Sequence, residues 1–94
     1  MTNTFNLKQD AYYPIRHDLL GALERYLNHG IMPGGFMTAV LENNLKEAFA
    51  RADDTNIENM KNIVGYVYNN IPSDSWGSRE AVNAWLESVT EKAA

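Results

Sequence analysis

Two adjacent glycines, Gly34 and Gly35, come directly before an amphipathic segment and are the residues best suited to binding a ligand. A glycine turn that opens a helix leaves backbone N–H groups free and lets a ligand approach closely. The helix dipole adds partial positive charge at the same place. This pattern suits a phosphate or carboxylate, but also a tight corner between helices. The corner is the preferred interpretation, because Pro33 and the glycines are common loop residues.

Side chains elsewhere in the chain would have to complete an anion site at this turn. Cationic residues near the start of the first predicted helix can reach a phosphate, and an aromatic ring can stack on a base. The glycine spacing matches neither the Walker loop nor the dinucleotide fingerprint. The predicted ligand-binding residues are Arg16, His17, Gly34, Gly35, Phe36, Trp76 and Gly77.

Catalytic and metal-binding patterns are poorly represented. The chain has no cysteine, which excludes disulfides and thiolate chemistry. His17 and His29 lie too far apart in sequence for a paired metal motif, and no serine stands in a Gly-x-Ser-x-Gly elbow. We therefore expect no metal, no cofactor and no catalytic residue, and a protein that is not an enzyme.

The composition is that of one small globular domain. The chain has 94 residues, of which 45% are hydrophobic and 21% charged, and its net charge is −4. An acidic chain without a basic run is not expected to bind duplex DNA, where cationic contacts supply most of the affinity. No apolar signal-peptide core or membrane-length apolar run is present, so we expect a cytoplasmic protein that does not contact membranes.

Four amphipathic stretches predict an all-α fold, a small bundle of about four helices with short loops. They run over residues 15–28, over 34–52, from Thr55 to about 70, and from Ser78 to about 90. Residues 1–12 predict an extended N-terminal arm, residues 13–90 a single helical domain, and residues 91–94 a frayed C-terminus.

Helix boundaries are indicated by particular residues. Pro14 suits a first helical position, Gly30 suits a left-handed helix end, and Ser78 suits an N-cap. Thr55 and Glu58 have the spacing of a capping box. The weak point of the second helix is the pair Asn43-Asn44. The residues expected to face the core include Phe36, Val40, Leu41, Leu45, Ala48 and Phe49 in that helix, and Met60, Ile63, Val64, Val67 and Tyr68 in the next.

Large aromatic and apolar side chains remain after each helix has filled its inner face. Tyrosine and tryptophan combine apolar area with one polar atom, a mixture that is enriched at interfaces but also covers the rims of small cores. These residues favour binding to another protein, and equally a homo-oligomer. The predicted interface residues are Phe5, Leu7, Tyr12, Tyr13, Tyr66 and Trp76.

The stretch from Gly30 to Asp53 resembles small proteins encoded by bacteriophages and prophages. The shared pattern is Gly30-x-x-Pro33-Gly34-Gly35-Phe36-x-x-Ala39-Val40-Leu41-Glu42-Asn43-Asn44-Leu45, followed by Ala48, Ala52 and Asp53. A turn like Trp76-Gly77-Ser78 and a tryptophan like Trp85 follow, so the resemblance covers about residues 14–86. Asn44 stands where an aspartate is usual in such proteins.

This resemblance implies an accessory phage protein that acts inside the bacterial host. The leading hypothesis is stoichiometric, non-enzymatic binding to a host protein that is a component of a bacterial defence system. One alternative is an oligomer that sequesters a nucleotide-type immune signal. A second alternative is a structural or assembly protein of the phage.

Overall fold

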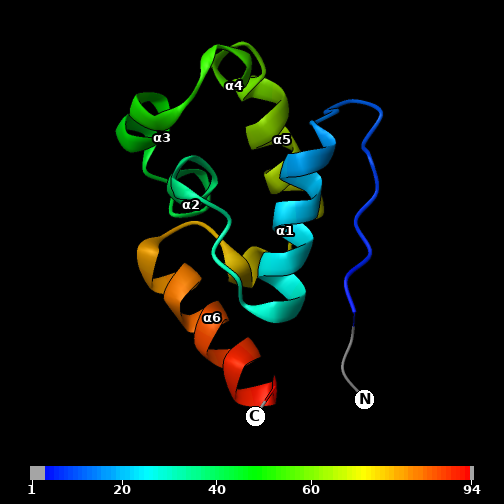
Figure 1. The fold of residues 1–94 in the computed structure, drawn as a ribbon, viewed down its shortest axis with the longest axis vertical. Coiled ribbons are helices and arrows are strands. Elements are labelled where there is room, and N and C mark those ends of the chain that lie inside the picture. Colours follow the sequence, from blue (N-terminus) through cyan, green and yellow to red (C-terminus); the bar gives the residue numbers. More distant parts are fainter. Residues whose placement is uncertain (1–3, 94) are drawn as a thin grey trace.

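The computed structural model describes residues 4–93, in which the regular secondary structure is helical and no strand is present (Figure 1). The predicted all-α class is confirmed. The described residues form six α-helices in place of about four. In chain order the elements are α1 (His17–His29), α2 (Gly35–Leu41), α3 (Leu45–Arg51), α4 (Asp54–Glu58), α5 (Met60–Asn70), the 3-10 helix η1 (Ser73–Ser75) and α6 (Arg79–Ala93).

The second predicted helix is wrong as a single element, because Asn43 separates α2 from α3. Asn43 has a φ of 61°, a left-handed conformation that asparagine tolerates better than most residues. The side-chain oxygen of Asn44 then accepts the backbone N–H of Glu47 at 3.3 Å and caps α3. Both asparagines thus favour a break at the predicted weak point.

The third predicted helix is also divided, at Asn59. The N-cap of α4 is Asp53 and not the predicted Thr55, because the Asp53 carboxylate accepts the backbone N–H of Asn56 at 2.8 Å. A single residue, Asn59, then ends α4 and precedes α5 with a φ of −101° and a ψ of 11°. The predicted end of this region near Asn70 agrees with the end of α5.

Other helix boundaries follow the sequence more closely. Gly30 ends α1 with a φ of 67°, and the Ser78 hydroxyl accepts the backbone N–H of Ala81 at 3.0 Å, so both predicted caps are confirmed. The first helix begins later than predicted, since Pro14 lies in the preceding segment. The last helix continues to Ala93, and the end of the predicted frayed region, residue 94, lies outside the described residues.

The core lies between α1, α2, α5 and α6. Tyr26 of α1 is fully buried, and its hydroxyl donates a hydrogen bond to the carbonyl of Ser75 in η1 at 2.7 Å. Burial, and then the nearby charge of Glu42, raise the pKa of this phenol above its ordinary value. The main apolar side chains around Tyr26 are Leu23, Leu27, Phe36, Met37, Leu41, Ile63, Tyr66, Val67, Ile71 and Val82.

The segment before α1 contains no helix or strand in its described part, residues 4–16. Figure 1 shows it running along the outside of α1 in the opposite direction. Its Phe5 and Leu7 side chains are half-buried and pack against the core. Residues 1–3 of the predicted arm lie outside the described residues.

Four side chains predicted to face the core are instead exposed to solvent. On α3 these are Leu45 and Phe49, with exposed fractions of 65% and 46%. On α5 they are Val64 and Tyr68, with 47% and 71%. The break at Asn43 changes the direction of α3 relative to α2, so one continuous helical stripe no longer faces one core. These four exposed side chains lead to the candidate site.

Candidate functional site

An apolar groove lies between α3 and α5 and has a volume of about 130 Å³. The end of α2 and the asparagine pair close one side, and Trp76 contributes from the segment after η1. We call this feature the α3–α5 groove. Its lining residues are Ala39, Val40, Asn43, Asn44, Leu45, Ala48, Met60, Val64, Val67, Tyr68 and Trp76.

The rim of the α3–α5 groove is formed by large apolar side chains. Leu45 on α3, and Val64 and Tyr68 on α5, line the groove and are also the strongly exposed residues named above. Phe49 lies one turn after Leu45 on α3. Exposed apolar side chains gathered around a groove on a small protein commonly mark an interaction site.

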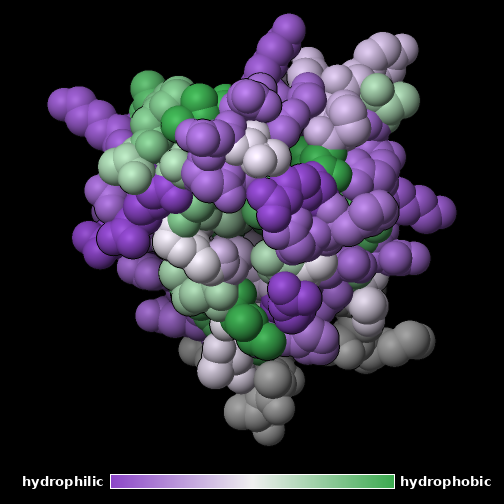
Figure 2. Space-filling view, turned by 45° about the horizontal axis from the view of Figure 1, so that its top comes forward, coloured by the Kyte–Doolittle hydropathy of each residue, from purple (hydrophilic) through white to green (hydrophobic). Residues whose placement is uncertain are grey.

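Hydrophobic surface is also visible in space-filling form. Figure 2 shows it in separate patches between hydrophilic side chains. The patch at the upper left lies on the side of the molecule where Figure 1 places α3. Hydrophilic side chains surround each hydrophobic patch on this face.

Trp76 is fixed inside the groove by two contacts. Its indole N–H donates a hydrogen bond to the carbonyl of Ile71 at 3.2 Å. Its ring packs against that of Tyr68, with 5.9 Å between the ring centroids and 60° between the planes. Trp76 was predicted both as a ligand-binding and as an interface residue, and the structure places it in the α3–α5 groove.

The lining of the groove carries no ionisable acid or base other than the Tyr68 phenol. The polar side chains in it are those of Asn43, Asn44, Tyr68 and Trp76, and that of Asn44 is already engaged in capping α3. The groove therefore favours apolar contact over the binding of a charged molecule.

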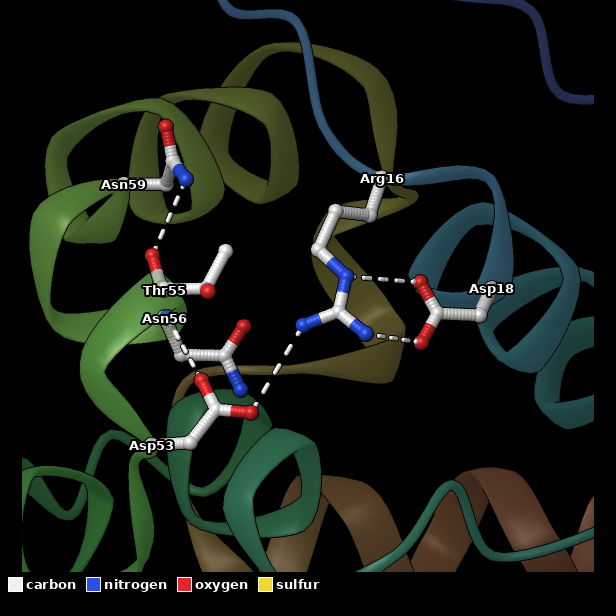
Figure 3. Close-up of polar contacts among 6 residues, drawn as sticks. All are labelled: Arg16, Asp18, Asp53, Thr55, Asn56 and Asn59. Carbon is white, nitrogen blue, oxygen red and sulfur yellow. Dashed lines mark hydrogen bonds and ion pairs between the residues drawn. The ribbon is translucent and has the colours of Figure 1, made fainter.

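Of the two side chains predicted to bind the anion by charge, Arg16 is paired with carboxylates and His17 is exposed to solvent. The Arg16 guanidinium forms a two-point hydrogen bond with the Asp18 carboxylate, at 3.1 and 2.8 Å, and lies 3.6 Å from an oxygen of Asp53 (Figure 3). Arg16 thereby links the start of α1 to the cap of α4. His17 is exposed at the first position of α1.

The glycine turn meets a different cation from the one predicted. A Cβ atom added to Gly35 would lie 2.9 Å from a guanidinium nitrogen of Arg51, which is itself paired with Glu47. Gly34 is exposed with a φ of 76°, and Phe36 is buried in the core. The turn is thus a corner leading into a helix of seven residues.

Gly77 has a structural contact of its own. Its backbone N–H donates a hydrogen bond to the carbonyl of Leu41 at 2.7 Å, and its φ is 113°. This bond joins the segment after η1 to the end of α2. Within the described residues, no hydrogen bond or ion pair joins Gly77 to Arg16 or to the glycine turn.

The predicted interface residues divide into three groups. Tyr66 is fully buried within the chain's own core, which contradicts its prediction as an interface residue. Phe5, Leu7 and Tyr13 are half-buried against the chain's own core. Tyr12 is 86% exposed.

The exposed residues of the groove were missed because each helix was assigned one buried face. The apolar residues of α5 in fact follow two stripes. One contains Ile63 and Val67 and is buried in the core, with Val67 also at the base of the groove. The other contains Met60, Val64 and Tyr68 at four-residue spacing and lines the groove. An apolar surface wider than one stripe was the available signal.

Comparison with models of protein families, with curated proteins and with solved structures finds no match to this chain. Within the described residues, no cluster of three or more histidine, aspartate or glutamate side chains is placed to hold a metal. None of the described helices has both the length and the apolar character needed to cross a bilayer.

Proposed function

We propose that this protein acts by stoichiometric binding of another protein, without catalysis, and that the α3–α5 groove is its binding site. The observation that carries the proposal is an apolar groove whose rim residues Leu45, Val64 and Tyr68 are exposed. Engineered cavities of about 150 Å³ hold a benzene molecule. A groove of 130 Å³ is therefore matched to one large apolar side chain of a partner.

The partner element that suits this groove is an amphipathic helix. The walls are helices whose backbone groups are used internally, so they offer no free strand edge to an extended peptide. A helix satisfies its own backbone and presents apolar side chains on one face. Met60, Val64 and Tyr68 span about 12 Å along α5, which corresponds to about two helical turns.

The resemblance to phage-encoded proteins supports a bacterial host protein as the partner. We propose that this partner belongs to a host defence system and that binding inhibits it. An acidic, non-enzymatic protein of this size inhibits by occupying a surface, so activity depends on a defined stoichiometry. A homo-oligomer would present several such grooves at once.

The proposal is tested by adding the same charge at two matched positions. Val64→Glu places a carboxylate in the groove, and Ile31→Glu places one on the loop after α1. The two wild-type side chains are both β-branched and have similar exposed fractions, 47% and 51%. A partner captured from bacterial lysate by the wild type should be retained by Ile31→Glu and depleted at least about tenfold by Val64→Glu, because a carboxylate would be desolvated in the interface.

Circular dichroism of both variants checks that each remains folded. Equal capture by the two folded variants would contradict the groove as the binding site. Calorimetry with the purified partner should then give a fixed stoichiometry, and catalytic turnover of any candidate substrate would contradict the non-enzymatic mode.

The nucleotide-sequestering alternative stays a prediction. Arg16 is paired with two aspartates, and Arg51 beside Gly35 is paired with Glu47. Native mass spectrometry of protein purified directly from cells distinguishes the alternatives, since a retained nucleotide would add its own mass in stoichiometric amount. The phage assembly alternative likewise stays a prediction.

A further inference from the structure

The N-terminal segment, residues 5–8, lies against the folded domain as an extended peptide. Phe5 and Leu7 are half-buried, whereas Asn6 and Lys8 are exposed. This alternation is the two-residue period of an extended chain. The two inward side chains pack against the core, and the Phe5 ring lies 5.8 Å from the ring of Trp85 on α6.

Side chains of the helices hold the backbone of this segment. The Asn28 amide accepts the N–H of Phe5 at 2.6 Å and donates to its carbonyl at 2.9 Å. The Glu24 carboxylate accepts the N–H of Leu7 at 3.3 Å. The Tyr66 hydroxyl donates to the carbonyl of Lys8 at 2.7 Å. Residues at least 17 positions away in sequence thus bind four backbone groups, as in a site for a separate peptide.

The link between the segment and α1 is a turn made by polar contacts. The Asp10 carboxylate accepts the N–H groups of Tyr12 and Tyr13 at 2.8 and 3.3 Å. Ala11 and Tyr12 at the centre of the turn are exposed. These two positions are therefore a hinge whose conformation decides whether the segment returns to its own domain.

We propose that the face formed by Asn28, Glu24, Tyr66 and Trp85 also binds the N-terminal segment of a second copy, giving a reciprocally exchanged dimer. Every hydrogen bond that holds the backbone of residues 5–8 comes from a residue at least 17 positions away, so each can be made in the same way when the segment comes from another copy. The segment's own sequence is the one that fits the site. Exchange changes the hinge, including the hydrogen bonds that Asp10 accepts from Tyr12 and Tyr13, and it costs the translational and rotational freedom that two copies lose on association.

The link between the segment and α1 decides whether the segment binds its own domain or a second copy. A short flexible link gives the segment an effective concentration in the millimolar range at its own site. At micromolar protein concentration the wild-type segment therefore binds its own domain, and the exchanged dimer does not form. If the hinge is held extended, the segment cannot reach its own domain and can bind only to a second copy, which gives the exchanged dimer.

The test uses the full chain with a stiffened hinge. Ala11→Pro combined with Tyr12→Pro, two residues before the native Pro14, favours an extended link. It also removes the N–H of residue 12 that the Asp10 carboxylate accepts. The matched control is Ala11→Ser with Tyr12→Ser, which keeps a flexible link. Light scattering should give twice the monomer mass of 10.6 kDa for the proline variant and the monomer mass for the serine variant.

Phe5→Ala with Leu7→Ala in the proline variant should return the mass to that of a monomer. A folded proline variant that remains monomeric would overturn the proposal, and so would a dimer that persists without Phe5 and Leu7. If the proline variant does not fold, wild-type protein refolded at about 1 mM should contain a dimer that is absent after refolding at micromolar concentration. Monomer alone at both concentrations would also overturn it.

Discussion

Replacing Gly65 by alanine tests how firmly the segment before α1 is attached to α5. A Cβ atom at this position would lie 2.2 Å from a ring carbon of Tyr13. That distance is far inside van der Waals contact, so the half-buried Tyr13 ring has to leave its place. In an ordinary helix interior the same substitution would instead stabilise the protein by about 1 kcal/mol.

The two effects have opposite signs and can be compared. A buried aromatic ring covers roughly 200 Å², and half of this, at about 25 cal/mol per Å², corresponds to about 2.5 kcal/mol. Subtracting the helix-propensity gain of about 1 kcal/mol leaves a net loss of up to about 1.5 kcal/mol for Gly65→Ala. In the background of Tyr13→Ala the ring is absent, and Gly65→Ala should raise the free energy of unfolding.

Urea unfolding of the four proteins in this double-mutant cycle measures both values. The expected result is a change of sign between the two backgrounds. If Gly65→Ala stabilises the protein while Tyr13 is present, the ring does not pack on Gly65 and the described attachment of the segment is incorrect. Equal destabilisation in both backgrounds would show that a different contact is responsible.

Three further predictions concern the core and the connection after η1. Tyr26→Phe removes the hydrogen bond to the carbonyl of Ser75 and should lower the free energy of unfolding by about 1–2 kcal/mol. The pKa of the Tyr26 phenol is raised in the folded state above its ordinary value of 10.0, so the stabilisation from the protonated phenol is fully present below pH 10 and is lost as the pH rises above 10. The free energy of unfolding of the wild type should therefore fall more steeply above pH 10 than that of Tyr26→Phe. Urea titrations at successive pH values measure this difference. Gly77→Ala should cost about 1–3 kcal/mol because a φ of 113° is strained for a residue with a Cβ, and an unchanged melting temperature would contradict this conformation.

Much of the helical structure was determined by local sequence. Gly30 and Ser78 act as the predicted caps because capping depends on a few neighbouring backbone groups. The all-α class likewise follows from the spacing of apolar residues. The pair Asn43-Asn44 was predicted as the weak point of the second helix, but the sequence did not show that the helix would end there.

The surface of the protein was decided by tertiary packing. Val64 and Ile63 are adjacent, equally apolar residues of α5, yet one is 47% exposed and the other 1%. Their difference depends on which neighbouring helix covers each face, and that arrangement depends on the breaks at Asn43 and Asn59. The sequence also did not show which distant residues pair with each other, for example Arg16 with Asp53, which lie 37 positions apart.

The sequence by itself therefore determined the helical class, several helix ends and the absence of cysteine chemistry. These properties arise from backbone hydrogen bonding and side-chain type over a few residues. The tertiary structure alone decided that the α3–α5 groove is open, that Arg16 is paired with Asp53, and that Asn28 holds the backbone of Phe5. Such features depend on how separate helices meet in space, which local periodicity does not specify.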